Sequence, residues 1–115
     1  MADTGNYIEL VLSCGSWQEA QRIADHLLQK RLITRAELLP VKSKFTWKGE
    51  LEAAEEISLI MLSLREFFDA VEAEVRQLHS YEAFVLRAVP VEQLSAEAIK
   101  WLREATQGLT GKISE

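Results

Sequence analysis

The chain has 115 residues, which is the length of one domain rather than two. Hydrophobic residues make up 48% and charged residues 27%, so we expect an ordered globular body. The net charge of −5 argues against a general binder of nucleic acid or of anionic membranes, whose affinity needs clustered positive charge. A cation remains an allowed partner for this acidic chain.

The compartment is predicted from cysteine use and from apolar runs. A single cysteine, Cys14, cannot form an internal disulfide, which favours a reducing compartment. No apolar run approaches the ~18 residues of a membrane span. Residues 1–6 contain no Lys or Arg before the first apolar segment, so no secretory signal is visible. We therefore predict a cytoplasmic protein that does not insert into a membrane.

The first elements are a predicted strand and a predicted helix. Residues 7–13 are apolar and rich in strand-forming side chains, and a glycine follows shortly after them. Ser16 and Glu19 then fit a capping box, in which both side chains accept hydrogen bonds from free N–H groups at a helix start. Apolar residues at helical spacing follow, which predicts a helix over residues 17–30.

A long β-hairpin is predicted over residues 32–62, where the hydrophobic period falls toward two. Its turn lies at Gly49, because glycine tolerates a positive φ. A two-residue turn would place Lys42 opposite Glu55, an attractive cross-strand pair. Pro40 argues for an edge position or a bulge in the first arm, since proline cannot donate to a strand ladder.

The rest of the chain predicts a helix, a strand and a third helix. Ser63 and Glu66 fit a second capping box, and an apolar stripe at helical spacing follows them. Residues 83–91 are typical of a further strand. Ser95 then caps the third helix, which we expect to stop at Gly108.

This order predicts an α+β fold of the ferredoxin-like β-α-β-β-α-β type, with a C-terminal helix. We expect one domain over residues 7–107, between a loose or disordered N-terminus at residues 1–6 and a loose tail at residues 108–115. Two helices would cover one face of a four-stranded antiparallel sheet and leave the other face without cover. An apolar open face usually indicates a partner subunit, so we predict self-association.

Two stretches of the sequence resemble the CutA family of divalent-cation-tolerance proteins. They are residues 31–52, R-L-I-T-R-A-E-L-L-P-V-K-S-K-F-T-W-K-G-E-L-E, and residues 64–82, L-R-E-F-F-D-A-V-E-A-E-V-R-Q-L-H-S-Y-E. The sharpest pieces are Arg31-Leu32, Leu39-Pro40, Trp47-Lys48-Gly49-Glu50 and His79-x-Tyr81-Glu82. The resemblance implies a homotrimer, with sheets packed about a threefold axis and long hairpins that reach between subunits.

Six positions and one length depart from the pattern of that family. Arg and Glu replace a usual Cys and Asn, Leu and Ser replace a usual Lys and Thr, the segment after the second helix lacks two prolines, and the stretch between Pro40 and Trp47 is one residue shorter. The departing residues are Arg35, Glu37, Leu62, Ser63, Ser80 and Phe84. We therefore interpret the chain as a divergent member with an altered pocket, in which the loss of the usual cysteine disfavours copper.

Three residues are candidate metal ligands for copper or zinc. His79 and Glu82 could bind a divalent cation with Tyr81 as a hydrogen-bond partner, and the resemblance implies that this segment faces an inter-subunit cleft. The alternative for His79 is a helix cap, because the helix dipole stabilises a histidine at a C-terminus without any ligand. Cys14 could add a soft thiolate, and its alternative is a buried cysteine at a strand end.

Other residues are assigned to a cleft, an interface or the solvent. Trp47 is either an interface anchor at the hairpin tip or a pocket wall. Tyr81, Arg35 and Glu37 are expected at the cleft or interface. The carboxylates within residues 50–56 are interpreted as a solvated face.

The sequence leaves two main functions open, besides the anchoring of a membrane protein through an exposed trimer surface, which it neither supports nor excludes. One is a trimer that responds to divalent cations and binds copper or a similar ion at inter-subunit clefts. The other is a PII-like trimer that binds a small non-metal effector or serves as a signalling scaffold. The sequence contains no Gly-rich phosphate loop, no nucleophile elbow and no zinc signature, so we predict that the protein is not an enzyme.

Overall fold

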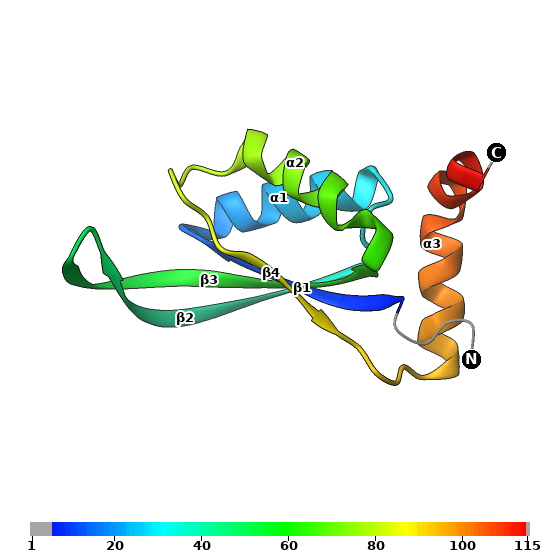
Figure 1. Cartoon of the computed structure of the whole chain (residues 1–115), viewed down its shortest axis with the longest axis horizontal. Coiled ribbons are helices and arrows are strands. Elements are labelled where there is room, and N and C mark those ends of the chain that lie inside the picture. Colours follow the sequence, from blue (N-terminus) through cyan, green and yellow to red (C-terminus); the bar gives the residue numbers. More distant parts are fainter. Residues whose placement is uncertain (1–5, 115) are drawn as a thin grey trace.

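The computed structural model describes the backbone of residues 6–114 and the side chains of residues 6–106. Its elements are β1 (Tyr7–Cys14), α1 (Trp17–Gln29), β2 (Arg35–Trp47), β3 (Glu50–Leu64), a 3-10 turn (Arg65–Phe67), α2 (Phe68–Leu78), β4 (Leu86–Pro90) and α3 (Ala96–Ser114). The strands form one antiparallel sheet in the order β2-β3-β1-β4. Helices α1 and α2 lie on one face, and α3 stands at one end of the sheet (Figure 1). The predicted ferredoxin-like α+β fold is confirmed.

The core lies between the sheet and the helices α1 and α2. Alternate residues of β1 and β3 face the helices. The buried residues of α1 and α2 recur every three or four positions and face the sheet. The buried set is Ile8, Leu10, Leu12 and Cys14 of β1, Ile57, Leu59 and Met61 of β3, Ala20, Ile23, Ala24 and Leu27 of α1, and Phe67, Val71 and Val75 around α2. Because burying one such large apolar side chain contributes about 1.5–3 kcal/mol, this set fixes the helices on that face.

The strands β2 and β3 form one long hairpin that projects beyond the rest of the sheet (Figure 1). Its turn residues Lys48 and Gly49 have φ angles of 51° and 84°, the left-handed values that a tight hairpin turn requires. Lys42 lies opposite Glu55, with their charged atoms 3.3 Å apart. Pro40 lies on the edge strand. The predicted turn, cross-strand pair and edge position are confirmed.

The second face of the sheet carries no helix from the described residues (Figure 1). The strand register places one set of alternate residues on it. We call the part of this set that lies away from the hairpin turn the open face: Val11, Arg35, Glu37, Leu39, Ile60, Leu62 and Val89. Leu39 is 44% exposed, although leucine is usually buried. The sheet therefore presents apolar side chains to the outside, as the sequence predicted.

Ser63 does not cap a helix. It lies in β3, is fully buried, and its Oγ donates a hydrogen bond of 2.6 Å to the Leu32 carbonyl. The helical turn begins at Arg65, and Leu64 before it makes no side-chain cap. The predicted second capping box is therefore wrong, because the strand continues to Leu64 and turns the Ser63 hydroxyl into the core, where it needs a partner.

We expect Ser63→Ala to lower the free energy of unfolding by about 1–2 kcal/mol, because the Leu32 carbonyl loses its hydroxyl donor inside the protein. Urea denaturation at equal protein concentration measures the loss. Ser58→Ala, in the same strand on the opposite face, is the control and should change stability little. Equal stability of the two variants would contradict this role of Ser63.

The last two elements differ in length from their predictions. Strand β4 begins at Leu86, after a loop that takes up the first residues of the predicted strand. The Ser95 Oγ accepts a hydrogen bond of 3.3 Å from the Ala98 N–H, so the predicted cap of α3 is confirmed. The predicted stop at Gly108 is wrong, since α3 continues to Ser114; a glycine inside a helix costs only about 1 kcal/mol relative to alanine.

The predicted domain limits stay a prediction. The N-terminal segment, residues 1–6, lies outside the described residues except for Asn6. Side chains beyond residue 106, including those of the predicted tail at residues 108–115, also lie outside them.

Candidate functional site

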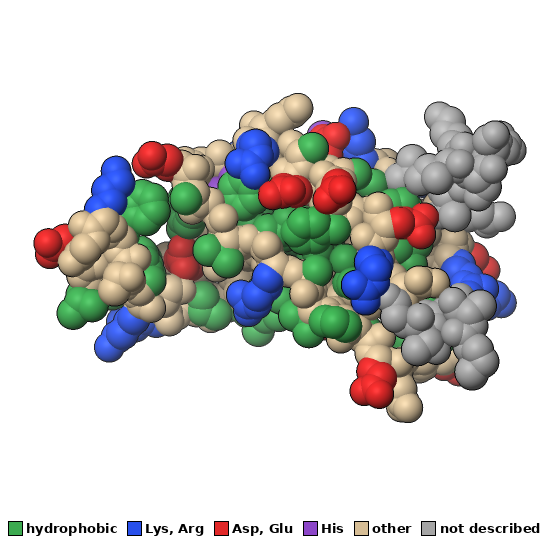
Figure 2. All heavy atoms as spheres, viewed as in Figure 1, with side chains coloured by type: hydrophobic (Ala, Val, Ile, Leu, Met, Phe, Trp, Pro, Cys, Tyr) green, Lys and Arg blue, Asp and Glu red, His purple; other side chains and the backbone are tan. Residues whose placement is uncertain are grey.

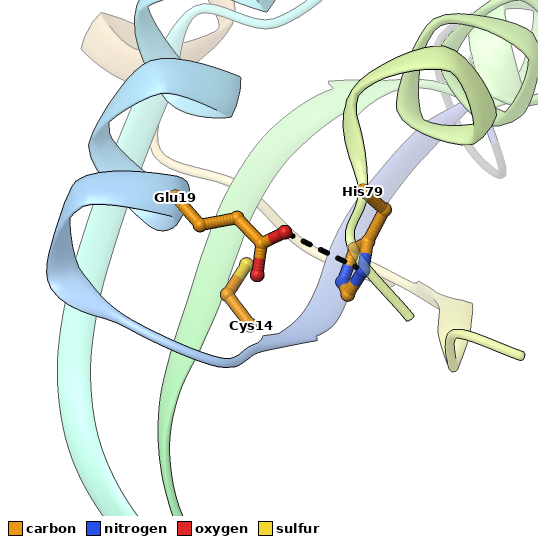
Figure 3. Close-up of side chains that lie close together, drawn as sticks. All are labelled: Cys14, Glu19 and His79. Carbon is orange, nitrogen blue, oxygen red and sulfur yellow. Dashed lines mark ion pairs between the residues drawn. The ribbon is translucent and has the colours of Figure 1, made fainter. Parts of the chain in front are cut away.

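Three side chains with metal-binding donor atoms converge where β1, α1 and the segment after α2 meet (Figure 3). Cys14 ends β1, Glu19 lies in the first turn of α1, and His79 directly follows α2. One donor atom of each lies within 4.8 Å of the other two. Cys14 and Glu19 are buried, and the His79 side chain is fully enclosed. We call these residues the Cys14–Glu19–His79 cluster.

Glu19 joins two segments that are far apart in the sequence. The Ser16 Oγ caps α1 by accepting a hydrogen bond of 3.1 Å from the Glu19 N–H. The Glu19 carboxylate accepts 2.9 Å and 2.6 Å hydrogen bonds from the N–H groups of Gly15 and Ser80. A Cβ added at Gly15 would lie 3.2 Å from the Tyr81 ring, so the turn before α1 has little room for a side chain.

His79 is held in one neutral tautomer by two backbone groups. Its Nε2 lies 2.7 Å from the Ser13 carbonyl and donates to it, while its Nδ1 accepts from the Tyr81 N–H at 3.1 Å. The Glu19 carboxylate lies 3.8 Å from Nδ1. Phe84 stacks on the ring, with centroids 5.3 Å apart. The imidazole is in its metal-binding protonation state, but a metal at Nδ1 would displace the Tyr81 N–H.

The protonation states follow from burial and from the contacts of the cluster. Burial would raise the pKa of the Glu19 carboxyl, but the hydrogen bonds from Gly15 and Ser80 outweigh it and hold that pKa below its ordinary value. Burial raises the pKa of the Cys14 thiol to about 12, and the negative charges of Glu19 and Glu56 add to this effect. At neutral pH Glu19 thus contributes a carboxylate to the cluster and Cys14 a thiol.

The structure brings together only part of the predicted ligand set. His79 and Cys14 meet, but the Glu82 side chain is 77% exposed and its carboxylate lies 3.9 Å from Lys48 Nζ at the hairpin turn. Glu19 completes the cluster instead. The sequence identified Glu19 only as a capping residue. The signal that could have identified it as a metal ligand was its position in the first turn of the helix that directly follows Cys14.

Tyr81 is the link between this cluster and the hairpin. Its hydroxyl donates a hydrogen bond of 2.6 Å to the carboxylate of Glu56 in β3. Burial and this carboxylate raise the pKa of the Tyr81 hydroxyl above its ordinary value. Glu56 is itself only 7% exposed, so the prediction of a solvated acidic face is wrong at this residue. The segment after α2 covers it.

A cavity of about 610 Å³ opens between the hairpin and the segment that follows Tyr81. The residues around it are Ser13, Ser43, Lys44, Phe45, Thr46, Trp47, Ala54, Glu56, Tyr81, Glu82, Ala83, Phe84 and Val85. Trp47 and Tyr81, predicted as cleft residues, are both among them. The predicted pair Arg35 and Glu37 lies elsewhere, on β2, where the two side chains bind each other at 2.9 Å.

Comparison with known proteins decides the family. The sequence matches the family model described as CutA1 divalent ion tolerance protein over residues 8–105. This chain belongs to the CutA1 divalent ion tolerance family. Its membership supports a role in divalent-ion tolerance and confirms the resemblance found in the sequence.

Relatives of this CutA protein come from distant organisms. The divalent-cation tolerance protein CutA of Archaeoglobus fulgidus is 36% identical over 98 residues, which are 85% of this chain and 96% of the relative. The human Protein CutA is 28% identical over 111 residues, which are 96% of this chain and 62% of the human protein. The chain therefore spans nearly the whole archaeal relative and under two thirds of the human one.

Solved structures have the same fold. The structure described as the periplasmic divalent cation tolerance protein CutA from Archaeoglobus fulgidus has a TM-score of 0.85 and 35% identity. The match covers 87% of this chain and 98% of the Archaeoglobus chain. CutA1 from Oryza sativa also has a TM-score of 0.85, at 21% identity over 90% of this chain and 95% of its own. The rice likeness supports the fold alone. No helix in the described part of this chain is long and apolar enough to cross a membrane.

Two residues interpreted from the sequence as departures from the CutA pattern contact the cluster or its surroundings. Ser80 donates its N–H to the Glu19 carboxylate, which a proline could not do because it lacks an N–H. The Phe84 ring stacks on the His79 ring and lies 4.9 Å from the Arg76 guanidinium. Both residues therefore help to hold the cluster in place.

Proposed function

We propose that this CutA protein serves divalent-cation tolerance as a homotrimer that binds copper or zinc at the Cys14–Glu19–His79 cluster. The observation that carries the proposal is the set of three donor atoms within 4.8 Å of one another. Imidazole, thiolate and carboxylate ligands suit zinc, and the thiolate also suits copper. A thiolate, a carboxylate and a neutral imidazole together carry two negative charges, which balance one divalent cation.

Binding would couple to proton release and to movement of one backbone contact. A coordinating thiol is deprotonated by the ion, so Cys14, with its pKa raised to about 12, would release a proton on binding at neutral pH. His79 Nδ1 would exchange the Tyr81 N–H for the ion. The apparent affinity should therefore rise with pH, by about tenfold per unit for the one proton lost.

We expect Cys14→Ser to weaken zinc binding by at least about tenfold, because the hydroxyl does not replace the thiolate ligand. Competition with a chromophoric chelator measures the affinity, and zinc is the chosen ion because it has no redox chemistry with the thiol. The same titration in weak buffer at two pH values detects the released proton.

Glu82→Ala is the matched control, since Glu82 lies outside the cluster and pairs with Lys48. It should leave zinc affinity unchanged. Equal affinity of Cys14→Ser and the unaltered chain would overturn the proposed site. A loss of zinc affinity in Glu82→Ala alone would indicate that the ion binds beside the hairpin instead.

The other parts of the proposal concern assembly, activity and compartment. The apolar open face supports a homotrimer in which each sheet covers another. A binding role rather than catalysis is supported by Cys14, which is a thiol and not a nucleophilic thiolate at neutral pH. A cytoplasmic location is proposed from the single cysteine, although the Archaeoglobus fulgidus structure is described as periplasmic.

The second candidate function is that of a PII-like trimer, which binds a small non-metal effector. The cavity of about 610 Å³ beside the hairpin favours it, because small-molecule sites are concave, mostly apolar and edged by a few polar groups. A thermal-shift screen of metal ions against small organic molecules separates the two candidates. A ligand of the native state raises the melting temperature, so stabilisation by organic molecules alone would favour the second.

A further inference from the structure

The cavity beside the hairpin has aromatic walls and one buried charge. Phe45 and Trp47 of β2 and Phe84 from the opposite side line it. At this end of the molecule, on the left of Figure 2, apolar side chains lie among a few acidic and basic ones. Such walls favour a ligand with an apolar body, since aromatic rings bury much area and bind cations on their faces.

Glu56 is the buried charge of this cavity. It is 7% exposed, and among the described side chains its carboxylate hydrogen-bonds only to the neutral Tyr81 hydroxyl. No Lys, Arg or His of residues 6–106 lies within ion-pair distance of it. A buried carboxylate without a cation is costly to keep in a fold. It therefore provides a counter-ion for a positively charged ligand.

The other charged groups around the cavity do not fill this role. Glu82 already pairs with Lys48 at 3.9 Å, and both side chains are largely exposed. Lys44 is exposed to solvent. The Lys48 ammonium lies 5.3 Å from the centroid of the Trp47 ring, so this wall already accepts a cation on its face.

We infer that the cavity binds a small organic cation, a primary amine on an apolar body, whose ammonium group pairs with Glu56. The apolar body lies against Phe45, Trp47 and Phe84. This inference rests on the second candidate function and names the ligand class of that site. It is independent of the Cys14–Glu19–His79 cluster.

The test uses three probes of one shape on the full chain. 2-Phenylethylamine, 2-phenylethanol and 3-phenylpropionate share an aromatic body and differ in charge. Isothermal titration calorimetry at neutral pH measures each of them. The amine should bind at least about tenfold more tightly than the alcohol, and the carboxylate should not bind, because it would meet Glu56 as a like charge.

Two variants separate the charge of Glu56 from its hydrogen bond. Glu56→Gln removes the charge, whereas Tyr81→Phe removes the same hydrogen bond and keeps the carboxylate. Glu56→Gln should lose the preference for the amine over the alcohol, and Tyr81→Phe should keep it. Glu55→Gln, at a carboxylate that is 82% exposed and lies outside the cavity lining, should also keep it. Circular dichroism checks that each variant is folded.

Each contrary result has a distinct meaning. Equal binding of the amine and the alcohol overturns the inferred ligand class and leaves the cavity as an effector site. Binding of none of the probes overturns both the inference and its basis in the second candidate function. An equal loss of preference in Tyr81→Phe and Glu56→Gln also overturns the inference, because the hydrogen bond would then be the determinant. Even where a variant fails to fold, the three probes on the unaltered chain show whether the cavity prefers the amine.

Discussion

Replacing Glu19 by alanine is expected to lower the free energy of unfolding by about 3 kcal/mol, because two backbone donors lose a charged acceptor at once and each such hydrogen bond contributes about 1.5–3 kcal/mol. The donors are the N–H groups of Gly15 and Ser80, at 2.9 Å and 2.6 Å from the carboxylate. Urea denaturation followed by circular dichroism, at one fixed protein concentration, measures the loss. We expect Glu19→Ala to be among the most damaging substitutions of a charged residue in this chain.

Two further variants test whether the loss of stability comes from the two hydrogen bonds of the Glu19 carboxylate. Glu55→Ala removes a carboxylate whose side chain is 82% exposed, and it should change stability by less than about 0.5 kcal/mol. Ser80→Pro removes one of the two donors, so its loss should fall between those of the other two variants. A Glu19→Ala protein as stable as Glu55→Ala would show that the carboxylate does not hold the two segments together.

The same residue gives an expected pH dependence. The folded pKa of Glu19 is lowered, so its contribution to stability is complete above the ordinary glutamate pKa of about 4.3 and is lost as the pH falls through the folded value. Glu19→Gln, which carries no charge at any pH, lacks this contribution. The stability difference between the unaltered chain and Glu19→Gln should therefore shrink as the pH is lowered below about 4.

The elements that the sequence predicted well are those with local signals. The cap at Ser16, the positive-φ turn at Gly49 and the pairing of Lys42 with Glu55 each depend on residues close in sequence or fixed by one turn. At Ser63 the local sequence signal gave the wrong prediction. The pairing of β1 with β3 extends to Leu64, so the strand ladder and the core outweigh a capping box.

The candidate site could not be predicted in full because its contacts cross the whole chain. Ser13 and His79 are 66 residues apart, and the loop after α2 takes its path from the packing of α2 on the sheet. That loop buries Glu56, whose alternating strand pattern indicated solvent, and it directs Glu82 away from the cluster. Glu19 was visible as a cap, but its second partner, Ser80, belongs to the loop.

Self-association of the open face should fail when a charge is placed in its apolar part. Leu39 lies on the edge strand β2, is 44% exposed in the single chain, and packs little within it. We expect Leu39→Glu to weaken the proposed trimer by at least about 100-fold, because an uncompensated charge buried at an interface costs about 3–5 kcal/mol and each 1.4 kcal/mol is tenfold in affinity. Light scattering coupled to gel filtration measures the mass.

The control is a second exposed leucine on the other side of the molecule. Leu28 is 40% exposed and lies on α1, on the face that the helices cover, so Leu28→Glu adds the same charge away from the open face. It should leave the proposed trimer intact, and both variants should keep the circular dichroism of the unaltered chain. A trimer that tolerates Leu39→Glu would mean that subunits meet elsewhere and that the apolar side chains of the open face serve another partner.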